Sequence, residues 1–593
     1  MLETSNNTKG AAAAPAAGAC NCQKPAPHYP EQVTGMYILA RALKTIGIDT
    51  VYGLVGIPIT EAAYEIQGQG IRFVTFRHEQ QAGMAAATHG FVTGKPGIAM
   101  TVSSLGFLNG LTALANATVN CYPMIQISGS SQREPIDLDQ GTYEALDQYA
   151  VSKTVAKASY RVNRAEDIPT GVVRAYRAAI SGRPGGVYLD ITTPALGQIV
   201  DRDVAEALLN VPVDPAPAMV PADEAVTRAV ELLASAKKPA ILVGKGAAMA
   251  QVEDLVKKLV ETTGIPFYPM SMAKGVMPDN HPLSALSVRS TIMEDADVVM
   301  LVGARLNWLL SRGGGKWNKQ GKFIQLDIEP TEIDANRHID APVIGDLRSS
   351  LEAIIAKIES KGVKFAMDSA WVPGIQAESK VKNAKFLERL QPQTVPMTHW
   401  SALGAAKKVL EANPDVILVN EGANTLDDTR DSIDMFLPRH RIDCATWAIM
   451  GMGMGSAIGA AVASGKSVVA IEGDSAFGFS GMDFSTICRF NLPVTVCIFN
   501  NGGIYNGIGK PLDNTTDPAP TTLDINARYD KLGEAFGAQT YYVTTPDEFG
   551  KALAEGIASK KPCLIDVQLA ADSGKESGHI GYLNPAPLID IKV

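Results

Sequence analysis

From Glu31 onward, short apolar runs alternate with segments in which apolar residues recur every three or four positions. The segment 33–48 (VTGMYILARALKTIGI) has the helical spacing, whereas 97–103 (GIAMTVS) and 124–129 (MIQISG) are short apolar runs. Apolar runs that are separated by helical segments and bounded by glycine are typical of parallel strands joined by crossover helices. The pattern therefore predicts an α/β protein.

The same alternation occurs in three blocks along the chain. We predict three doubly wound parallel-sheet domains, at residues 31–210, 224–365 and 397–570. A Pro- and Ala-rich linker (211–223) and a polar, Lys-rich connector (366–396) separate them. Residues 1–30 are predicted to be a disordered leader, and the Gly-, Ser- and Pro-rich residues 571–593 a C-terminal lid.

Composition narrows the classes of function. A chain of 593 residues is too long for a single small binding module. Its 53 basic and 62 acidic residues give a net charge of −9 with no basic tract, which argues against a nucleic-acid partner. The seven cysteines form no CxxC pair, and no apolar run is long enough to span a membrane. We therefore expect a soluble cytoplasmic protein with no membrane partner.

The strongest chemical signal lies in the third block. Gly473-Asp474-Ser475 follows one apolar strand, and Asn500-Asn501 follows the next, with 24 residues between the two elements. Because parallel strands end at one edge of a sheet, Asp474 and Asn501 should lie close together. Carboxylate, amide and backbone oxygens suit Mg²⁺, and the neighbouring glycines admit a diphosphate. Either element alone reads equally well as a strand-ending turn, but the pair at this spacing favours a site.

These elements resemble the cofactor motif of the thiamine diphosphate-dependent enzymes, in which Gly-Asp-Gly and Asn-Asn elements hold Mg²⁺ and the diphosphate. Ser475 stands at the usual third glycine, where its hydroxyl can donate a hydrogen bond to a phosphate. The resemblance implies pyrimidine-binding, middle Rossmann-like and diphosphate-binding domains in that order. It places the metal on Asp474, Asn501 and the backbone of Gly503, and the cofactor also against Gly473, Ser475 and Ile504.

The family also needs a carboxylate for the cofactor's aminopyrimidine ring and an apolar side chain beneath its thiazolium. Glu79, in Arg77-His78-Glu79-Gln80 after the apolar run IRFVTF, is the carboxylate that the resemblance implies. It would hydrogen-bond the ring nitrogen and so help the adjacent imino group remove the proton from C2. Met450 is the candidate apolar support, with Ile449 and Met452 as alternatives.

Longer stretches resemble the branch of the family that decarboxylates oxalyl-CoA to formyl-CoA and carbon dioxide. They include residues 106–125, 129–148 and 472–496. The resemblance implies that Tyr143, Glu144, Tyr505 and Ser577 surround the reacting carbon. The alternatives are a 2-hydroxyacyl-CoA lyase, an acetolactate synthase and a noncatalytic CoA or nucleotide sensor. Retention of Glu79, Asp474 and Asn501 argues against the sensor.

Two further expectations concern partners. Lys245, Arg305 and Asp327 stand at strand ends of the middle block, where related enzymes bind ADP, although Gly244-Lys245-Gly246 also reads as a tight turn. Asn424 and Arg430 are candidates for contacts with CoA. Because Glu79 and the Asp474/Asn501 pair belong to different domains, the resemblance implies a cofactor shared between two subunits. We therefore expect a homodimer at least, and a tetramer in full.

Overall fold

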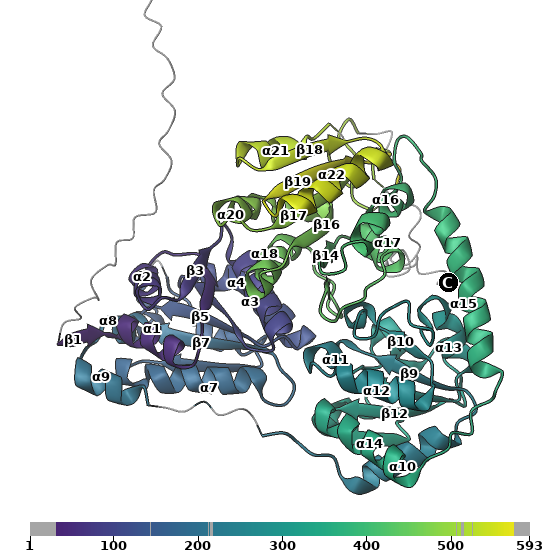
Figure 1. Ribbon diagram of the computed structural model, residues 1–593. Helices are drawn as coiled ribbons and strands as arrows, with labels where there is room; N and C mark the ends of the chain where they lie inside the picture. The colour runs from purple at the N-terminus through teal and green to yellow at the C-terminus, as the bar shows by residue number, and fades with distance from the viewer. Residues whose placement is uncertain are drawn as a thin grey trace, which may run out of the picture.

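The computed structural model describes residues 31–574, except 143, 211, 212, 214–216, 506, 512–514 and 525. Three sheets, each parallel throughout, lie in three successive parts of this chain, as Figure 1 shows. The prediction of an α/β protein with three parallel-sheet domains is confirmed. The predicted leader lies outside the described residues, as does the predicted lid beyond Gly574.

The first sheet has six strands in the order β3-β2-β4-β5-β7-β6. Its strands are β2 (Thr50–Gly53), β3 (Arg72–Thr75), β4 (Gly97–Thr101), β5 (Met124–Ser130), β6 (Ala158–Val162) and β7 (Gly186–Thr192). A separate antiparallel pair is formed by β1 (Gln32–Thr34) and β8 (Ile199–Asp201). The helices are α1 (Gly35–Thr45), α2 (Thr60–Gly68), α3 (Glu79–Thr93), α4 (Leu105–Asn120), α5 (Arg133–Asp137), α6 (Gln148–Ser152), α7 (Ile168–Ile180), α8 (Thr193–Gly197) and α9 (Arg202–Leu208).

The second sheet has five strands in the order β10-β9-β11-β12-β13. They are β9 (Pro239–Val243), β10 (Phe267–Pro269), β11 (Val298–Val302), β12 (Lys322–Asp327) and β13 (Ala341–Ile344). The accompanying helices are α10 (Asp223–Ser235), α11 (Lys245–Met249), α12 (Glu253–Thr263), α13 (Arg289–Asp295) and α14 (Leu347–Lys361). From here α15 (Trp371–Arg389) runs along the outside of the molecule to the third sheet (Figure 1).

The third sheet has six strands in the order β15-β14-β16-β17-β19-β18. They are β14 (Ile417–Glu421), β15 (Arg441–Ile442), β16 (Val468–Gly473), β17 (Val494–Asn500), β18 (Gln539–Val543) and β19 (Cys563–Gln568). Its helices are α16 (His399–Glu411), α17 (Asn424–Ser432), α18 (Gly453–Ser464), α19 (Asp474–Gly478), α20 (Phe484–Arg489), α21 (Tyr529–Ala535) and α22 (Pro546–Ser559).

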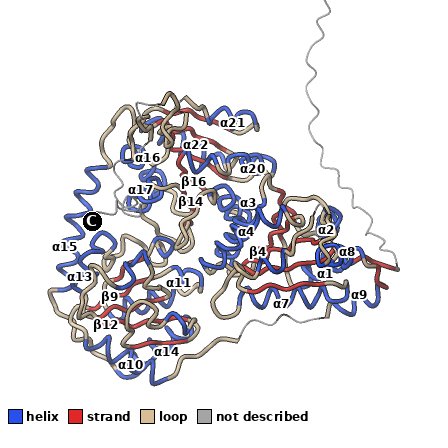
Figure 2. The backbone as a smooth tube through the Cα atoms, turned by 180° about the vertical axis from the view of Figure 1, so that it is seen from behind, coloured by secondary structure: helices blue, strands red, loops and turns tan. Residues whose placement is uncertain are grey.

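Helices α3 and α18 join the first and third domains, and Figure 1 shows them side by side; Figure 2 shows α3 from behind, between the two domains. Neither helix has a polar face, because each is buried on nearly all sides. Small residues let the two backbones approach closely: a Cβ added at Gly459 would lie 2.4 Å from the carbonyl oxygen of Ala85. This contact fixes Glu79, the first residue of α3, relative to the segment that precedes α18.

A buried lysine joins the second and third domains. The ammonium group of Lys274 donates hydrogen bonds to the carbonyl oxygens of Arg430 (2.8 Å) and Ile433 (2.7 Å). It also pairs with Asp279 at 3.3 Å, and Asp279 accepts a hydrogen bond from the amide of Met435. Partners on both sides compensate the cost of burying this charge. In the described part of the chain, no helix is long and apolar enough to cross a membrane.

Candidate active site at the edge of the third sheet

Asp474 and the turn at Asn501–Gly503 lie together at the carboxyl ends of β16 and β17. The buried Asp474 carboxylate accepts hydrogen bonds from the amides of Ser475 (2.7 Å) and Gly502 (2.8 Å). Burial raises the pKa of Asp474 to about 6, although amide donors partly oppose the shift. The structure thus brings together the two elements that the sequence places 24 residues apart.

The side chain of Asn501 is buried and fixed at both ends. Its Nδ2 donates to the carbonyl oxygen of Ser573 over 2.7 Å, and its Oδ1 accepts from the amide of Gly503 over 3.3 Å. The turn is glycine-dependent, because Gly502 has a φ of +74° and a Cβ on Gly503 would lie 2.4 Å from the backbone of Gly507. This turn holds the amide oxygen of Asn501 beside Asp474.

The donor set at this edge fits Mg²⁺ and a diphosphate. It consists of one desolvated carboxylate, one amide oxygen and backbone carbonyls, which are the hard oxygen ligands that Mg²⁺ prefers. Among the described residues, no group of three or more His, Cys, Asp or Glu side chains could hold another type of metal ion. Gly473 ends β16 next to Thr425, and the half-buried Ile504 donates its amide to Thr521.

Glu79 begins α3 in the first domain and is only 6% exposed. Its Oε2 accepts a hydrogen bond from Nδ2 of Asn109 over 3.0 Å, and a Cβ on Gly106 would come within 3.0 Å of its Oε1. Within the part of the chain that the structure describes, no hydrogen bond or ion pair links Glu79 with Asp474 or Asn501. The sharing of one cofactor between two subunits therefore stays a prediction.

Met450 lies in a segment that is held from both domains. The side-chain amide of Gln80 donates to the carbonyl oxygens of Met450 (3.5 Å) and Gly451 (3.3 Å). Gln81 donates to Gly451 as well, and its Oε1 accepts from the amide of Gly455 over 2.9 Å. These glutamines directly follow Glu79, so the first turn of α3 positions both the carboxylate and the segment that carries Met450.

Two buried glutamates at this segment were missed in the sequence. Glu421 ends β14 and accepts hydrogen bonds from the amides of Gly451 and Gly453, while Glu472 lies opposite it in register on β16. Neither carboxyl oxygen of Glu472 has a hydrogen-bond partner. Burial raises the pKa of Glu421 to about 7 and that of Glu472 well above its ordinary value. Burial therefore favours the protonated form of both carboxyl groups.

A cavity of about 1420 Å³ lies where the three domains meet. It is lined by four of the residues predicted to bind a nucleotide or CoA: Lys245, Arg305, Asp327 and Arg430. Burial lowers the pKa of Lys245 to about 8, and its ammonium group lies 4.6 Å from the ring centre of Tyr122. The cationic side chains of Lys245, Arg305 and Arg430 in this lining suit a phosphorylated ligand.

The structure does not bring Asn424 to this cavity. Asn424 is buried at the start of α17, where its side-chain amide donates to the carbonyl oxygen of Gly574 over 2.8 Å. That hydrogen bond places Asn424 near the Asn501 turn, because Gly574 directly follows Ser573, whose carbonyl oxygen accepts from Asn501. Arg430 lines the cavity and Asn424 does not, and contact of either residue with CoA stays a prediction.

The residues expected around the reacting carbon are described only in part. Tyr143 and Ser577 lie outside the described residues. Glu144 is 9% exposed, and its carboxylate accepts a hydrogen bond from the hydroxyl of Ser131 over 3.4 Å. Tyr505 is 46% exposed and has a φ of +55° just after the Asn501 turn. These two side chains lie at the carboxyl edges of the first and third sheets.

Comparison with known proteins identifies the class. Three family models match: thiamine pyrophosphate enzyme, N-terminal TPP binding domain (33–151), central domain (226–354) and C-terminal TPP binding domain (428–567). The chain therefore belongs to the thiamine pyrophosphate enzyme family and contains its thiamine diphosphate-binding domains.

Individual relatives match along nearly their whole length. The chain is 53% identical over 555 residues to oxalyl-CoA decarboxylase of Escherichia coli (strain K12), covering 94% of this chain and 98% of that protein. It is 41% identical over 570 residues to 2-hydroxyacyl-CoA lyase of Oryza sativa subsp. japonica, covering 93% and 98%. It is 35% identical over 571 residues to 2-hydroxyacyl-CoA lyase 1 of Homo sapiens, covering 93% and 97%.

Proposed function

We propose that this protein decarboxylates oxalyl-CoA to formyl-CoA and carbon dioxide with thiamine diphosphate and Mg²⁺. The observation that carries the proposal is the meeting of Asp474 with the Asn501–Gly503 turn at one sheet edge, in a chain 53% identical to a named oxalyl-CoA decarboxylase. The reaction balances, since one proton replaces the carboxylate that leaves as carbon dioxide.

The first and third domains contribute different residues to the proposed reaction. Asp474, Asn501 and the carbonyl oxygen of Gly503 would hold Mg²⁺, and Gly473, Ser475 and Ile504 would contact the cofactor. When bound, thiamine diphosphate supplies a nucleophilic carbon for the thioester carbonyl and an electron sink for the bond that releases carbon dioxide. Glu79 holds a proton at the aminopyrimidine ring nitrogen, and Met450 keeps the two rings bent toward each other.

The remaining polar residues act on the substrate and the proton. The hydroxyls of Tyr143, Tyr505 and Ser577 orient the oxalyl carboxylate, directly or through water. Tyr505, or a water organised by Glu144, delivers the proton that completes the formyl group. The hydrogen bond from Ser131 to Glu144 supports this role, because it helps to orient a carboxylate that is largely shielded from bulk solvent.

A 2-hydroxyacyl-CoA lyase is the second candidate. Identities of 41% and 35% over more than nine-tenths of the chain support it, because the same site would cleave a carbon–carbon bond to give formyl-CoA and an aldehyde. The lower identity ranks it behind the decarboxylase.

The cavity between the domains is proposed to bind the nucleotide part of a ligand, either ADP as an activator or CoA. Its lining supports this assignment through Lys245, Arg305 and Arg430. Asp327 lies at the end of β12, where it suits a ribose hydroxyl. Binding of ADP in the absence of substrate, measured by calorimetry, distinguishes an activator site from a site for CoA alone.

The active form is proposed to be at least a dimer. The carboxylate of Glu79 accepts a hydrogen bond within its own domain, and among the described residues no hydrogen bond or ion pair joins it to Asp474. An active monomer in sedimentation experiments would contradict the shared cofactor site.

The first experiment uses the purified full chain with Mg²⁺, thiamine diphosphate and oxalyl-CoA, followed by mass spectrometry of the thioesters. Stoichiometric formyl-CoA is the expected result. Intact oxalyl-CoA together with cleavage of a 2-hydroxyacyl-CoA would replace the decarboxylase with the lyase. If both thioesters stay intact, the proposed function fails.

A further inference from the structure

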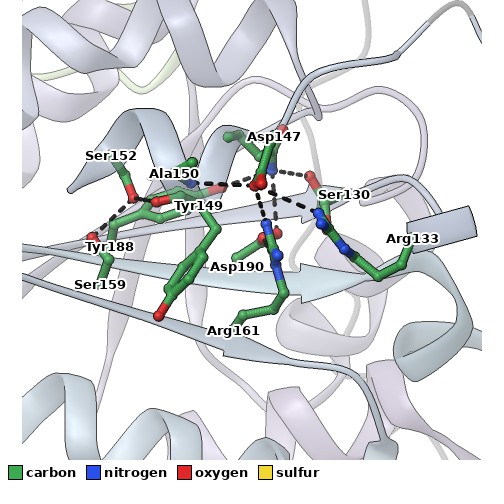
Figure 3. Close-up of polar contacts among 12 residues, drawn as sticks. Ser130, Arg133, Asp147, Tyr149, Ala150, Ser152, Ser159, Arg161, Tyr188 and Asp190 are labelled. Carbon is green, nitrogen blue, oxygen red and sulfur yellow. Dashed lines mark hydrogen bonds and ion pairs between the residues drawn. The ribbon is translucent and has the colours of Figure 1, made fainter. Parts of the chain in front are cut away.

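The loop that carries Glu144 leaves the first sheet at the end of β5 and returns to it at α6. Residues 131–147 make up this loop, which contains the short helix α5. Its described residues include Leu146, which packs against Phe107, Leu114 and Tyr188, and Ser131, which donates a weak hydrogen bond to the Glu144 carboxylate; the charged contacts lie at the loop's two ends. The polar contacts at those ends are drawn in Figure 3.

A buried ion pair on the sheet forms the base of these contacts. Arg161 on β6 and Asp190 on β7 are direct partners in register, and Nε of Arg161 donates to the Asp190 carboxylate over 2.7 Å. The Asp190 side chain is fully buried, whereas that of Arg161 is 14% exposed. Desolvation raises the pKa of Asp190, and the hydrogen bond and charge of Arg161 act in the opposite direction.

The other end of the guanidinium holds the loop. Nη2 of Arg161 donates to Oδ1 of Asp147, which also lies 3.5 Å from Nη1 of Arg133. Arg133 follows the start of the loop and Asp147 ends it, so one carboxylate ties both ends together, as the dashed lines in Figure 3 show. The ring of Tyr149 covers Arg161 with its centre 4.5 Å from the guanidinium carbon.

The next residue connects this cluster to the catalytic edge. Gln148 is buried, and its Oε1 accepts a hydrogen bond from the amide of Ser104 over 2.8 Å. Ser104 directly precedes α4, whose Asn109 holds Glu79. Nε2 of Gln148 also lies 2.7 Å from the hydroxyl of Tyr188 on β7. The end of the loop and the carboxylate of Glu79 are therefore fixed by the same group of elements.

We propose that Arg133, Asp147, Arg161 and Asp190 form a loop clamp that positions Glu144 for the proton transfer of the proposed decarboxylation. Arg161 and Asp147 are positioning residues in this clamp and touch no reactant. The inference rests on the proposed function, because one of its tests measures kcat. Its other test measures amide exchange in the loop and needs no substrate.

Asp147→Asn is the informative substitution, because it removes the negative charge that pairs with Arg161 and Arg133 and leaves the Arg161–Asp190 pair intact. The side chain of Asp147 is 38% exposed, so its loss leaves no buried charge unpaired. We expect kcat to fall at least about tenfold with KM for oxalyl-CoA and cofactor affinity within about twofold. Amide exchange in residues 131–147 should accelerate.

A double-mutant cycle separates positioning from general stabilisation. If the clamp acts through Glu144, then Asp147→Asn added to Glu144→Gln lowers kcat no further than Glu144→Gln alone. Additive losses, or unchanged exchange in the loop, would overturn the clamp. Arg161→Lys gives a second test, because it keeps the charge but cannot reach both carboxylates with a planar fork.

The matched control is Arg41→Gln, which breaks the 2.8 Å pair between Arg41 and Glu206 in the same domain. It should leave kcat and the exchange of residues 131–147 unchanged. If the wild-type protein forms no formyl-CoA, the proposed function fails, and the exchange experiment alone decides whether the clamp holds the loop.

Discussion

The side-chain amide of Asn109 donates a 3.0 Å hydrogen bond to Oε2 of Glu79. Asn109 lies on α4 and Glu79 begins α3, so the bond joins two helices that follow different strands. It fixes the rotation of the carboxyl group and leaves Oε1 next to Gly106, where a side chain would intrude. A carboxyl group held in this way has a defined orientation for a hydrogen bond with a ring nitrogen of the cofactor.

Glu79→Gln should abolish turnover and leave the fold intact. The amide retains the shape of the side chain but cannot exchange a proton with the cofactor, so we expect a loss of at least about 100-fold in kcat. Formation of formyl-CoA and the thermal unfolding midpoint are measured together. Glu61→Gln, on the exposed face of α2 in the same domain, is the control. Wild-type turnover in Glu79→Gln would refute the role of Glu79.

Asp474→Asn should weaken Mg²⁺-dependent binding of thiamine diphosphate. The substitution removes the only carboxylate of the proposed ligand set, and a hydrogen bond or ligand contact to a charged group contributes about 1.5–3 kcal/mol. Affinity should therefore fall at least about tenfold in calorimetric titrations of the full chain. Asp547→Asn, exposed at the start of α22, should bind like the wild type. Equal affinities in all three proteins would remove Asp474 from the metal site.

Gly453→Ala should destabilise the protein. The added Cβ would lie 2.0 Å from Oε1 of Glu472 and 2.9 Å from Oε2 of Glu421, both deeply buried. Overpacking of this kind costs about 1–3 kcal/mol, which thermal unfolding detects. Gly374→Ala on α15 is the matched control, because nothing lies within 4 Å of its new Cβ. In a helix this control should stabilise by up to about 1 kcal/mol. A Gly453→Ala protein as stable as the wild type would contradict the packing described.

His399 should make stability fall as the solution becomes acidic. Burial lowers its pKa from 6.5 to about 4, and the neutral ring lies 2.7 Å from the hydroxyl of Ser573. Between these two pKa values the unfolded chain binds the proton and the folded chain does not, so stability is lost as the pH falls from about 6.5 to about 4. The full loss is on the order of 3 kcal/mol.

The measurement is denaturant unfolding at several pH values for the wild type and His399→Asn. Other groups titrate in the same range, so the difference between the two pH profiles isolates His399. The variant should show the shallower decline. Parallel profiles would mean that His399 is not buried in its neutral form.

The three sheets could be predicted from the sequence because the apolar pattern that indicates each strand is local. Asp474 and Asn501 could be paired from sequence, since strand ends of a parallel sheet share one edge. Glu421 and Glu472 were missed because each reads as the end of an apolar strand, and their contact depends on the register of β14 with β16. Local sequence does not reveal that register.

The burial of Asn424 is a second feature that could not be predicted from the sequence. Its segment NEGANTLDDTR is polar and reads as a surface, yet α17 is largely buried. The partner of Asn424 is the carbonyl of Gly574, 150 residues along the chain. Long-range contacts of this kind bury polar side chains without changing the local pattern. Helices α3 and α18, which are rich in small residues, present the same difficulty, because their composition indicates burial but not the partner.

The buried Lys274 has a consequence for how such chains can recombine. Its ammonium group belongs to the central domain, while two of its acceptors are backbone carbonyls of the third domain. A central domain transplanted from a relative without a cation here would leave those carbonyls without this donor, and Asp279, if it came along, without its charged partner. We therefore expect these two domains to be inherited as one unit, and functional chimeras to keep their junction on a single parental segment.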